Sequence, residues 1–194
     1  MSLKEEFIDI YNENIKRDGA QELLSWMETT DFFVAPASTK YHCACHEGLL
    51  KHSLNVYKVM MDKHFDKETD NIESATISTL LHDICKSHFY KVSTRNVKNS
   101  VTGAWEQVPF YMVEDVFPYG HGEKSVFLIE RFMRLKPAEA MAIRWHMGGF
   151  DDSARAGGNT MSLAFDKYPL AVKVHMSDLE ATYLREKGTS EVNK

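Results

Sequence analysis

The adjacent residues His82 and Asp83 form the part of this sequence whose chemistry is easiest to name. They stand at the end of an apolar stretch with a helical pattern, inside the run 80–86, and bring an imidazole and a carboxylate into one pocket. A mixed set of nitrogen and oxygen ligands suits Fe, Mn, Zn, Co or Ni better than Ca or Mg alone. Two close metals with a bridging hydroxide are a common device for cleaving phosphate esters. Further side chains able to ligate a metal recur in separate segments, and these are His52, His121, His146 and Asp178.

Helices must position most of these residues, because apolar side chains recur with a period near 3.6 along much of the chain. Gly19, Pro137 and the pair Gly148-Gly149 mark helix boundaries. We predict helices over residues 3–15, 20–28, 48–64, 72–85, 123–135, 137–146 and 169–186, and loops over 29–41 and 150–164.

The faces of two predicted helices carry polar residues that interrupt an apolar stripe. His52 lies on a mostly apolar face, and His175 and Asp178, three residues apart, share a face with Ala171. Burying such groups costs free energy unless they are hydrogen-bonded or ligated. One metal ion would satisfy several of them at once, and His175 is interpreted as a residue that orients a ligand.

Each candidate has a simpler explanation when it is taken alone. A single buried histidine such as His52 is more often a hydrogen-bonded core residue than a ligand, and Asp178 alone would be a helix-surface acid. Their joint occurrence in a chain with nine histidines favours a shared metal centre. The segment from His42 to His46 holds two cysteines and two histidines, but it lacks the second ligand pair of a zinc finger.

The segment 89–113 differs from its surroundings, because its Val, Trp and Tyr residues favour strands. We predict a β-hairpin that forms a wall or lid of the pocket, with Trp105 or Tyr111 as a stacking surface for substrate. The alternative is a hairpin that covers hydrophobic core or makes a contact in a homodimer. Lys91 and Arg95 are candidate contacts to substrate phosphates, although surface cations beside a hairpin are the simpler explanation.

The composition narrows the class of protein. With 194 residues, of which 43% are hydrophobic, the chain fits a single domain that buries a sizeable core. The net charge of −5 argues against a broad nucleic-acid-binding surface but leaves a short nucleotide as a ligand. Three cysteines without framework spacing, no signal peptide and no apolar run long enough to span a membrane predict a cytoplasmic protein with no membrane partner.

The six ligands in their order along the chain, together with Lys86, resemble the HD-domain metal-dependent phosphohydrolases. Within that superfamily, residues 35–54 are similar to the bacterial HD-domain 3′–5′ exoribonucleases, which carry a His-His-Ala…Gly-Gly-Leu-Leu-Glu-His-Thr pattern. Those exonucleases also have a separate nucleic-acid-binding module, for which this chain has no room, so no long nucleic acid is expected as a partner. The residues that match the pattern are His42, Gly48, Leu49, Leu50 and His52, whereas Cys43 and Glu47 depart from it.

The resemblance implies an all-α fold, the HD-domain helical bundle, with a small β-hairpin insertion. Residues 1–194 would form a single HD domain. Short N-terminal helices would occupy residues 1–30, the HD core about 42–187, and a frayed tail 188–194.

The resemblance also implies how the ligands divide between two metals. Lys86 would stabilise the charge of the substrate phosphate, and its alternative role is that of a favourable cation at a helix C-terminus. Asp83 and Lys86 are therefore the catalytic candidates, and His42 is a candidate substrate contact. The first metal would be held by His52, His82, Asp83 and Asp178, and Asp83 would bridge to a second metal held by His121 and His146.

The activity expected from the resemblance is hydrolysis of a small phosphoester, a nucleotide above all, with a metal-bridging hydroxide as the nucleophile. The same ligand pattern also resembles the mixed-valent di-iron oxygenases of the HD superfamily, such as myo-inositol oxygenase. A non-enzymatic nucleotide sensor is a third hypothesis, and the complete ligand set argues against it.

Overall fold

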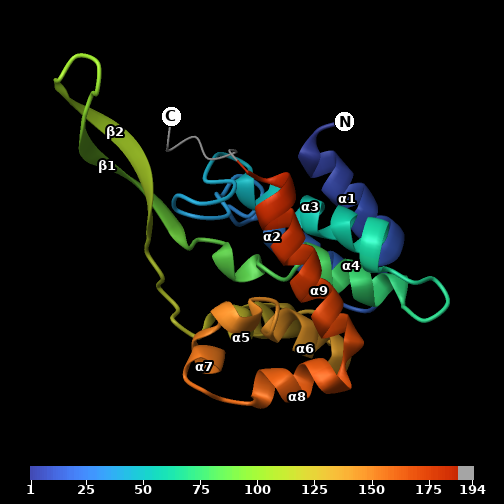
Figure 1. Cartoon of the computed structure of the whole chain (residues 1–194). Coiled ribbons are helices and arrows are strands. Elements are labelled where there is room, and N and C mark those ends of the chain that lie inside the picture. Colours follow the sequence, from blue (N-terminus) through green and yellow to red (C-terminus); the bar gives the residue numbers. More distant parts are fainter. Residues whose placement is uncertain (188–194) are drawn as a thin grey trace.

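Helices make up most of residues 1–187, which are the part of the chain that the computed structural model describes (Figure 1). The predicted frayed tail, 188–194, lies outside these described residues. The α-helices are α1 (Leu3–Asn14), α2 (Ala20–Glu28), α3 (Gly48–Val59), α4 (Ile72–Leu80), α5 (His121–Glu130), α6 (Pro137–Arg144), α7 (Asp152–Arg155), α8 (Thr160–Lys167) and α9 (Pro169–Glu180). Short π-helical segments, η1 (Met60–His64) and η4 (Ala181–Arg185), continue α3 and α9, and short 3-10 segments are η2 (Ile84–Lys86) and η3 (Gly148–Phe150).

The mostly helical fold with a small hairpin confirms the coarse part of the predicted fold class. Within residues 1–187, no helix combines the length and the apolar character needed to cross a membrane.

The hydrophobic core joins helices from both ends of the chain. Ser2 and Glu5 form a reciprocal capping box that satisfies free N–H groups at the start of α1. The buried cluster then takes side chains from α1 to α6, and α9 packs against α3, α4 and α6. Its members include Phe7, Tyr11, Leu23, Leu49, Leu50, Leu80, Ile129 and Ile143.

A buried ionic network fastens the N-terminal helices to α4 and α6. The guanidinium of Arg17 donates to both carboxylate oxygens of Glu139, each at 2.7 Å, and to Glu73 at 2.9 Å. Ser74 donates to the same Glu139 carboxylate at 2.6 Å. Because Glu139 is fully buried, these bonds replace the hydration that its charge has lost.

The predicted hairpin forms, and it stands away from the helical body (Figure 1). Strands β1 (Tyr90–Lys98) and β2 (Trp105–Val113) pair antiparallel, from Tyr90 opposite Val113 to Lys98 opposite Trp105. Both strands are largely exposed along their length.

Several predicted boundaries are wrong. The helix predicted over 72–85 ends at Leu80, and the helix predicted over 137–146 ends at Arg144. The helix expected from residue 123 begins at His121. The predicted loop 150–164 contains α7 and the start of α8. The polar residues of this segment lie on exposed faces of these helices, so they did not indicate a loop.

Candidate metal centre

Separate segments of the fold bring the six predicted ligands together. They lie in α3, just beyond the ends of α4 and α6, at the start of α5, and in α9. Within each of three overlapping groups, the ligand atoms lie within 4.8 Å of one another, so the groups could hold a metal ion. The groups are His52 with His82 and Asp83, His82 with His146 and Asp178, and Asp83 with His121 and His146.

His82 and His146 occupy the same local position at the ends of two different helices. Each lies two residues beyond the last helical residue, of α4 and of α6 respectively. His82 Nδ1–H donates to the Thr79 carbonyl at 2.8 Å, and His146 Nδ1–H donates to the Ile143 carbonyl at 2.7 Å. The last carbonyls of a helix lack partners within it, so each ring satisfies one of them. The bond also fixes the ring and leaves the lone pair of Nε2 for a metal.

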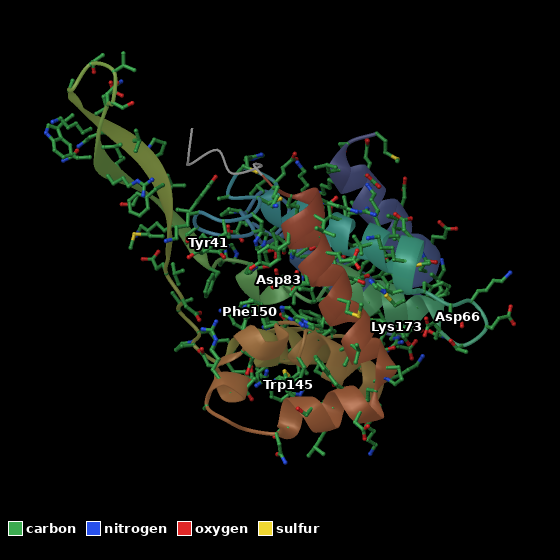
Figure 2. All side chains as sticks on the ribbon, viewed as in Figure 1. Tyr41, Asp66, Asp83, Trp145, Phe150 and Lys173 are labelled. Atoms are coloured by element: carbon green, nitrogen blue, oxygen red, sulfur yellow. The ribbon has the colours of Figure 1, made fainter. Side chains whose placement is uncertain are left out.

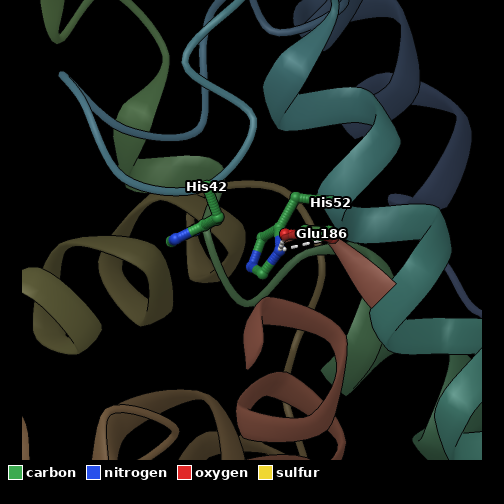
Figure 3. A group of neighbouring side chains, drawn as sticks. All are labelled: His42, His52 and Glu186. Carbon is green, nitrogen blue, oxygen red and sulfur yellow. Dashed lines mark hydrogen bonds and ion pairs between the residues drawn. The ribbon is translucent and has the colours of Figure 1, made fainter. Parts of the chain in front are cut away.

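Glu186, which the sequence reasoning missed as a site residue, holds the ring of His52. Its carboxylate lies 3.1 and 3.2 Å from His52 Nδ1 (Figure 3), and it also accepts from Asn55 at 2.8 Å. His52 Nε2 therefore faces His82 Nε2 and Asp178 Oδ1, each at 3.2 Å. Glu186 lies eight residues after Asp178, a spacing that recurs on one face of a helix. This spacing could have identified Glu186 from the sequence.

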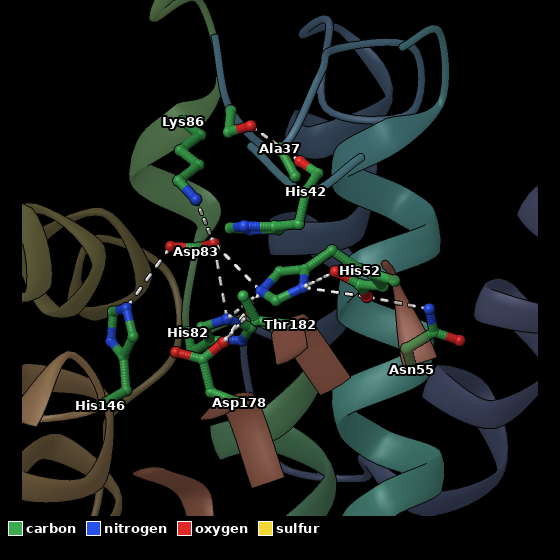
Figure 4. A network of polar contacts seen from close by, with 12 residues as sticks. Ala37, His42, His52, Asn55, His82, Asp83, Lys86, His146, Asp178 and Thr182 are labelled. Carbon is green, nitrogen blue, oxygen red and sulfur yellow. Dashed lines mark hydrogen bonds and ion pairs between the residues drawn. The ribbon is translucent and has the colours of Figure 1, made fainter. Parts of the chain in front are cut away.

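Asp83 lies in the middle of the cluster (Figure 4). Its Oδ1 atom is 2.9 Å from His121 Nε2 and 3.5 Å from His146 Nε2. Its Oδ2 atom is 3.5 Å from His82 Nε2 and 3.6 Å from His52 Nε2. Each carboxylate oxygen thus faces a different pair of imidazoles.

Lys86 forms a buried ion pair with Asp83, at 2.6 Å between Nζ and Oδ2. Burial raises the pKa of Asp83, but the charges of Lys86 and His82 outweigh it, so this pKa lies well below its usual range. Burial lowers the pKa of Lys86, and the Asp83 carboxylate reverses the direction and raises it above its usual range. Both groups are therefore charged at neutral pH.

The carboxylates beside His52 make its ring more basic. Burial lowers the pKa of His52, but the carboxylates of Glu186 and Asp178 outweigh burial and raise it to about 10. Burial likewise raises the pKa of Glu186, yet the charge of His52 brings it down to about 2. A metal bound at His52 Nε2 would replace a proton of the ring, so metal binding is expected to release protons to solution.

A close approach of α5 to α6 sets the position of His121. A Cβ on Gly122 would lie 2.2 Å from the Arg144 carbonyl oxygen, so only glycine permits this contact. The rings of His121 and His146 are consequently 5.0 Å apart. The buried Cys85 Sγ lies 3.4 Å from His121 Nδ1, and burial raises the pKa of this thiol to about 12, which keeps its proton in place.

The donor set fits divalent transition metals. His146 Nε2 is sealed from solvent and has no hydrogen-bond partner within residues 1–187. The carboxylate oxygen Asp83 Oδ1 lies 3.5 Å from it. A buried polar atom without a partner costs free energy, and a metal ion at this nitrogen would remove the cost.

A pocket of about 860 Å³ opens onto the cluster. This volume lies in the range of small-molecule sites. Its lining includes Lys86 and most of the predicted ligands, together with Tyr41 and Phe150, which are labelled above and below Asp83 in the view of Figure 2.

His42 is the one predicted substrate contact that lines this pocket. Its ring lies 4.8 Å from that of His52, and its Nε2 atom is buried without a hydrogen-bond partner in the described residues. Burial, with the nearby charges of His52 and Lys86, lowers the pKa of His42 to about 4, so the ring is neutral at physiological pH.

The other predicted substrate contacts lie on the hairpin outside the pocket lining. The physical reason is that the ribbon extends away from the body, so only its root, with Phe89, Tyr90 and Val113, reaches the pocket. Four predicted contacts, Lys91, Arg95, Trp105 and Tyr111, do not line the pocket. Lys91 pairs with Glu114, the Arg95 guanidinium lies over the Phe110 ring, and Trp105 is exposed.

Comparison of the chain with protein-family models, with curated proteins and with solved structures found no match. What this chain does is therefore inferred from its own side chains.

Proposed function

We propose that the chain is an HD-domain metal-dependent phosphohydrolase that cleaves a small phosphoester, with nucleotides as the substrate class. The observation that carries the proposal is the position of Asp83. Its two oxygens face two pairs of imidazoles, and Lys86 lies beside it in a pocket large enough for a nucleotide.

Hydrogen bonds within the chain orient three of the predicted ligand rings. The backbone carbonyls of Thr79 and Ile143 and the carboxylate of Glu186 accept hydrogen bonds from the Nδ1–H groups of three histidines. Such partners fix the tautomer and raise the basicity of the ligating nitrogen. Divalent metals bound there would supply positive charge for the phosphate and would lower the pKa of a water molecule.

Lys86 and His42 both line the pocket and are the candidate contacts for the phosphate. The buried ammonium of Lys86 would stabilise negative charge on it, and water exclusion strengthens that interaction. His42 presents a neutral ring, whose Nε2 atom has no competing partner in the described part of the chain. These roles match those that the resemblance to HD-domain enzymes implies.

The experiment combines metal analysis with an anaerobic activity screen. Protein purified without chelators is analysed for bound metals, and phosphoesters are then tested with Mn²⁺ and Fe²⁺ in the absence of dioxygen. We expect two metals per chain and turnover without dioxygen. Activity that appears only with Fe and dioxygen, on a substrate without a phosphate ester, would establish the oxygenase alternative instead.

A pair of histidine variants tests whether the cluster is responsible for metal binding and turnover. His146→Ala removes a buried predicted ligand and is expected to lower both metal content and turnover. His46→Ala removes an exposed histidine that does not line the pocket, and both quantities should be retained. Equal behaviour of the two variants would contradict the assignment of the centre.

A further inference from the structure

One histidine of the pocket lies outside every group that could hold a metal. His175 lines the pocket, one helical turn before Asp178 in α9, yet it belongs to none of the potential ligand groups found in residues 1–187. A histidine that faces a pocket without being a ligand is available for contact with the substrate.

A hydrogen bond to the backbone fixes which nitrogen of His175 can accept. Its Nδ1–H donates to the carbonyl oxygen of His146 at 2.6 Å. In a neutral imidazole with the proton on Nδ1, the other nitrogen carries a lone pair. The Nε2 atom has no hydrogen-bond partner in the described residues, and it is not among the side-chain atoms sealed from solvent. It is therefore an acceptor without a protein partner in the described residues, on a side chain that lines the pocket.

The ring is held rigidly in this orientation. Phe165 packs on it, with ring centroids 5.7 Å apart. On another side lies Gly148, whose φ of +55° and lack of a side chain leave room for the ring. A Cβ at that position would lie 2.3 Å from His175 Cε1 and 2.5 Å from Nε2. Substitution of Gly148 would thus displace the ring, and the close approach is built into the site.

From this geometry we infer that His175 is a specificity residue that accepts a hydrogen bond from a hydroxyl group of the substrate, close to the ester oxygen. The inference rests on the proposed function and deepens it: the substrate class becomes phosphate esters of sugars or other polyols, nucleosides with free ribose hydroxyls included. The position one turn from Asp178 and the hydrogen bond to the His146 carbonyl place the ring next to two of the predicted ligands. Phe150, which also lines the pocket, offers an apolar surface to the rest of the ligand.

The test measures binding, so that it does not depend on turnover. Two hydrolysis-resistant nucleoside phosphonates, one with both ribose hydroxyls and one with neither, are titrated calorimetrically into manganese-loaded protein. Because a site built around a hydrogen bond rejects an analogue that lacks the donor, the wild type should prefer the hydroxyl-bearing compound by about tenfold or more.

Two variants separate the substrate contact from the contact with His146. His175→Asn places an amide N–H where Nδ1 was and keeps a donor for the His146 carbonyl, but it removes the acceptor. The preference of this variant for the hydroxyl-bearing compound should fall to within about twofold, and its metal content should be retained. His175→Gln places an amide oxygen near the position of Nε2, and it should keep a preference that His175→Asn lacks.

The outcomes distinguish this inference from the proposed function. Equal affinities in the wild type, failure of both compounds to bind, or a preference that survives in His175→Asn would overturn the role of His175. Hydroxyl-dependent binding by a protein that hydrolyses no phosphoester would support the contact and count against the proposed hydrolase activity.

Discussion

The helical body and the hairpin are held together in opposite ways. In the body, contacts join residues far apart in sequence: Glu186 reaches His52, and Arg17 reaches Glu139, through buried charged groups. In the hairpin, each strand has the other as its main partner, and most side chains are exposed. The body thus depends on charges that have lost their water, whereas the hairpin depends on local backbone pairing.

The difference predicts where the chain is sensitive to change. A buried charge that loses its partner is expensive, while an exposed side chain contributes little. Substitutions of buried charged groups in the body should therefore have large effects on metal binding or stability. Substitutions on the outer hairpin should have small ones.

Asp83→Ala is expected to have the largest effect. It removes the carboxylate that faces all four imidazoles, and it leaves Lys86 buried without its partner. Turnover should be abolished and metal content lowered, while far-ultraviolet circular dichroism stays largely helical because the apolar helix faces remain. Asp62→Ala, an exposed control, should retain metals and activity. An Asp83→Ala protein with normal metals and rate would remove this residue from the centre.

Glu139→Ala tests the body without touching the centre. The change leaves the Arg17 guanidinium without its main partner in a partly buried position, and it should reduce the free energy of unfolding by about 3–5 kcal/mol. Chemical denaturation measures this value. The matched control is Glu28→Ala, which breaks an exposed pair with Lys4 and should cost at most about 1 kcal/mol. Similar losses in both variants would refute the contrast between buried and exposed pairs.

Glu186→Gln tests the contribution of a buried charge at the candidate metal centre. The variant keeps the shape of the side chain but removes the charge that orients His52 and makes its ring more basic. Metal affinity, measured by competition with a chelator, should fall by about 10- to 100-fold. Glu180→Gln, one helical segment earlier, loses contacts with Lys63 and His64 outside the pocket and should leave the affinity unchanged.

Glu73→Gln removes a stabilisation that depends on pH. Partial burial raises the pKa of Glu73, but the hydrogen bond from Arg17 outweighs it, so the folded-state pKa lies below 4.5. A carboxylate with a lowered pKa stabilises the fold above its unfolded pKa, and that contribution is lost as the pH falls through the folded value. The difference in unfolding free energy between wild type and variant should be constant near neutral pH and shrink below about pH 4.5. A difference that grows in acid would contradict this sign.

Trp105→Ala and Tyr111→Ala should have the smallest effects. Neither side chain lines the pocket, and Trp105 is 71% exposed near the tip of the hairpin. Trp105→Ala should alter the unfolding free energy by no more than about 0.5 kcal/mol, and both changes should leave KM for a phosphoester substrate unchanged. A selective rise in KM would show that the hairpin reaches the substrate after all, as the sequence had suggested.

The sequence by itself was sufficient for properties that depend on residue type and local pattern. The period of 3.6 located α1 to α4 and α9, and the strand-forming run with Thr102-Gly103 located the hairpin. Residue chemistry singled out His52, Asp83 and the other members of the cluster before any contact was known. These features need no knowledge of distant partners.

Only the tertiary structure decided which residues meet. The helices before His82 and His146 stop early because each ring takes a carbonyl at the helix end, an outcome that apolar periodicity does not report. Glu186 enters the site through a contact across 134 positions of sequence. The outer part of the hairpin does not line the pocket. Strand propensity predicts the pairing of β1 with β2, but the direction of the hairpin depends on how its root packs on the body.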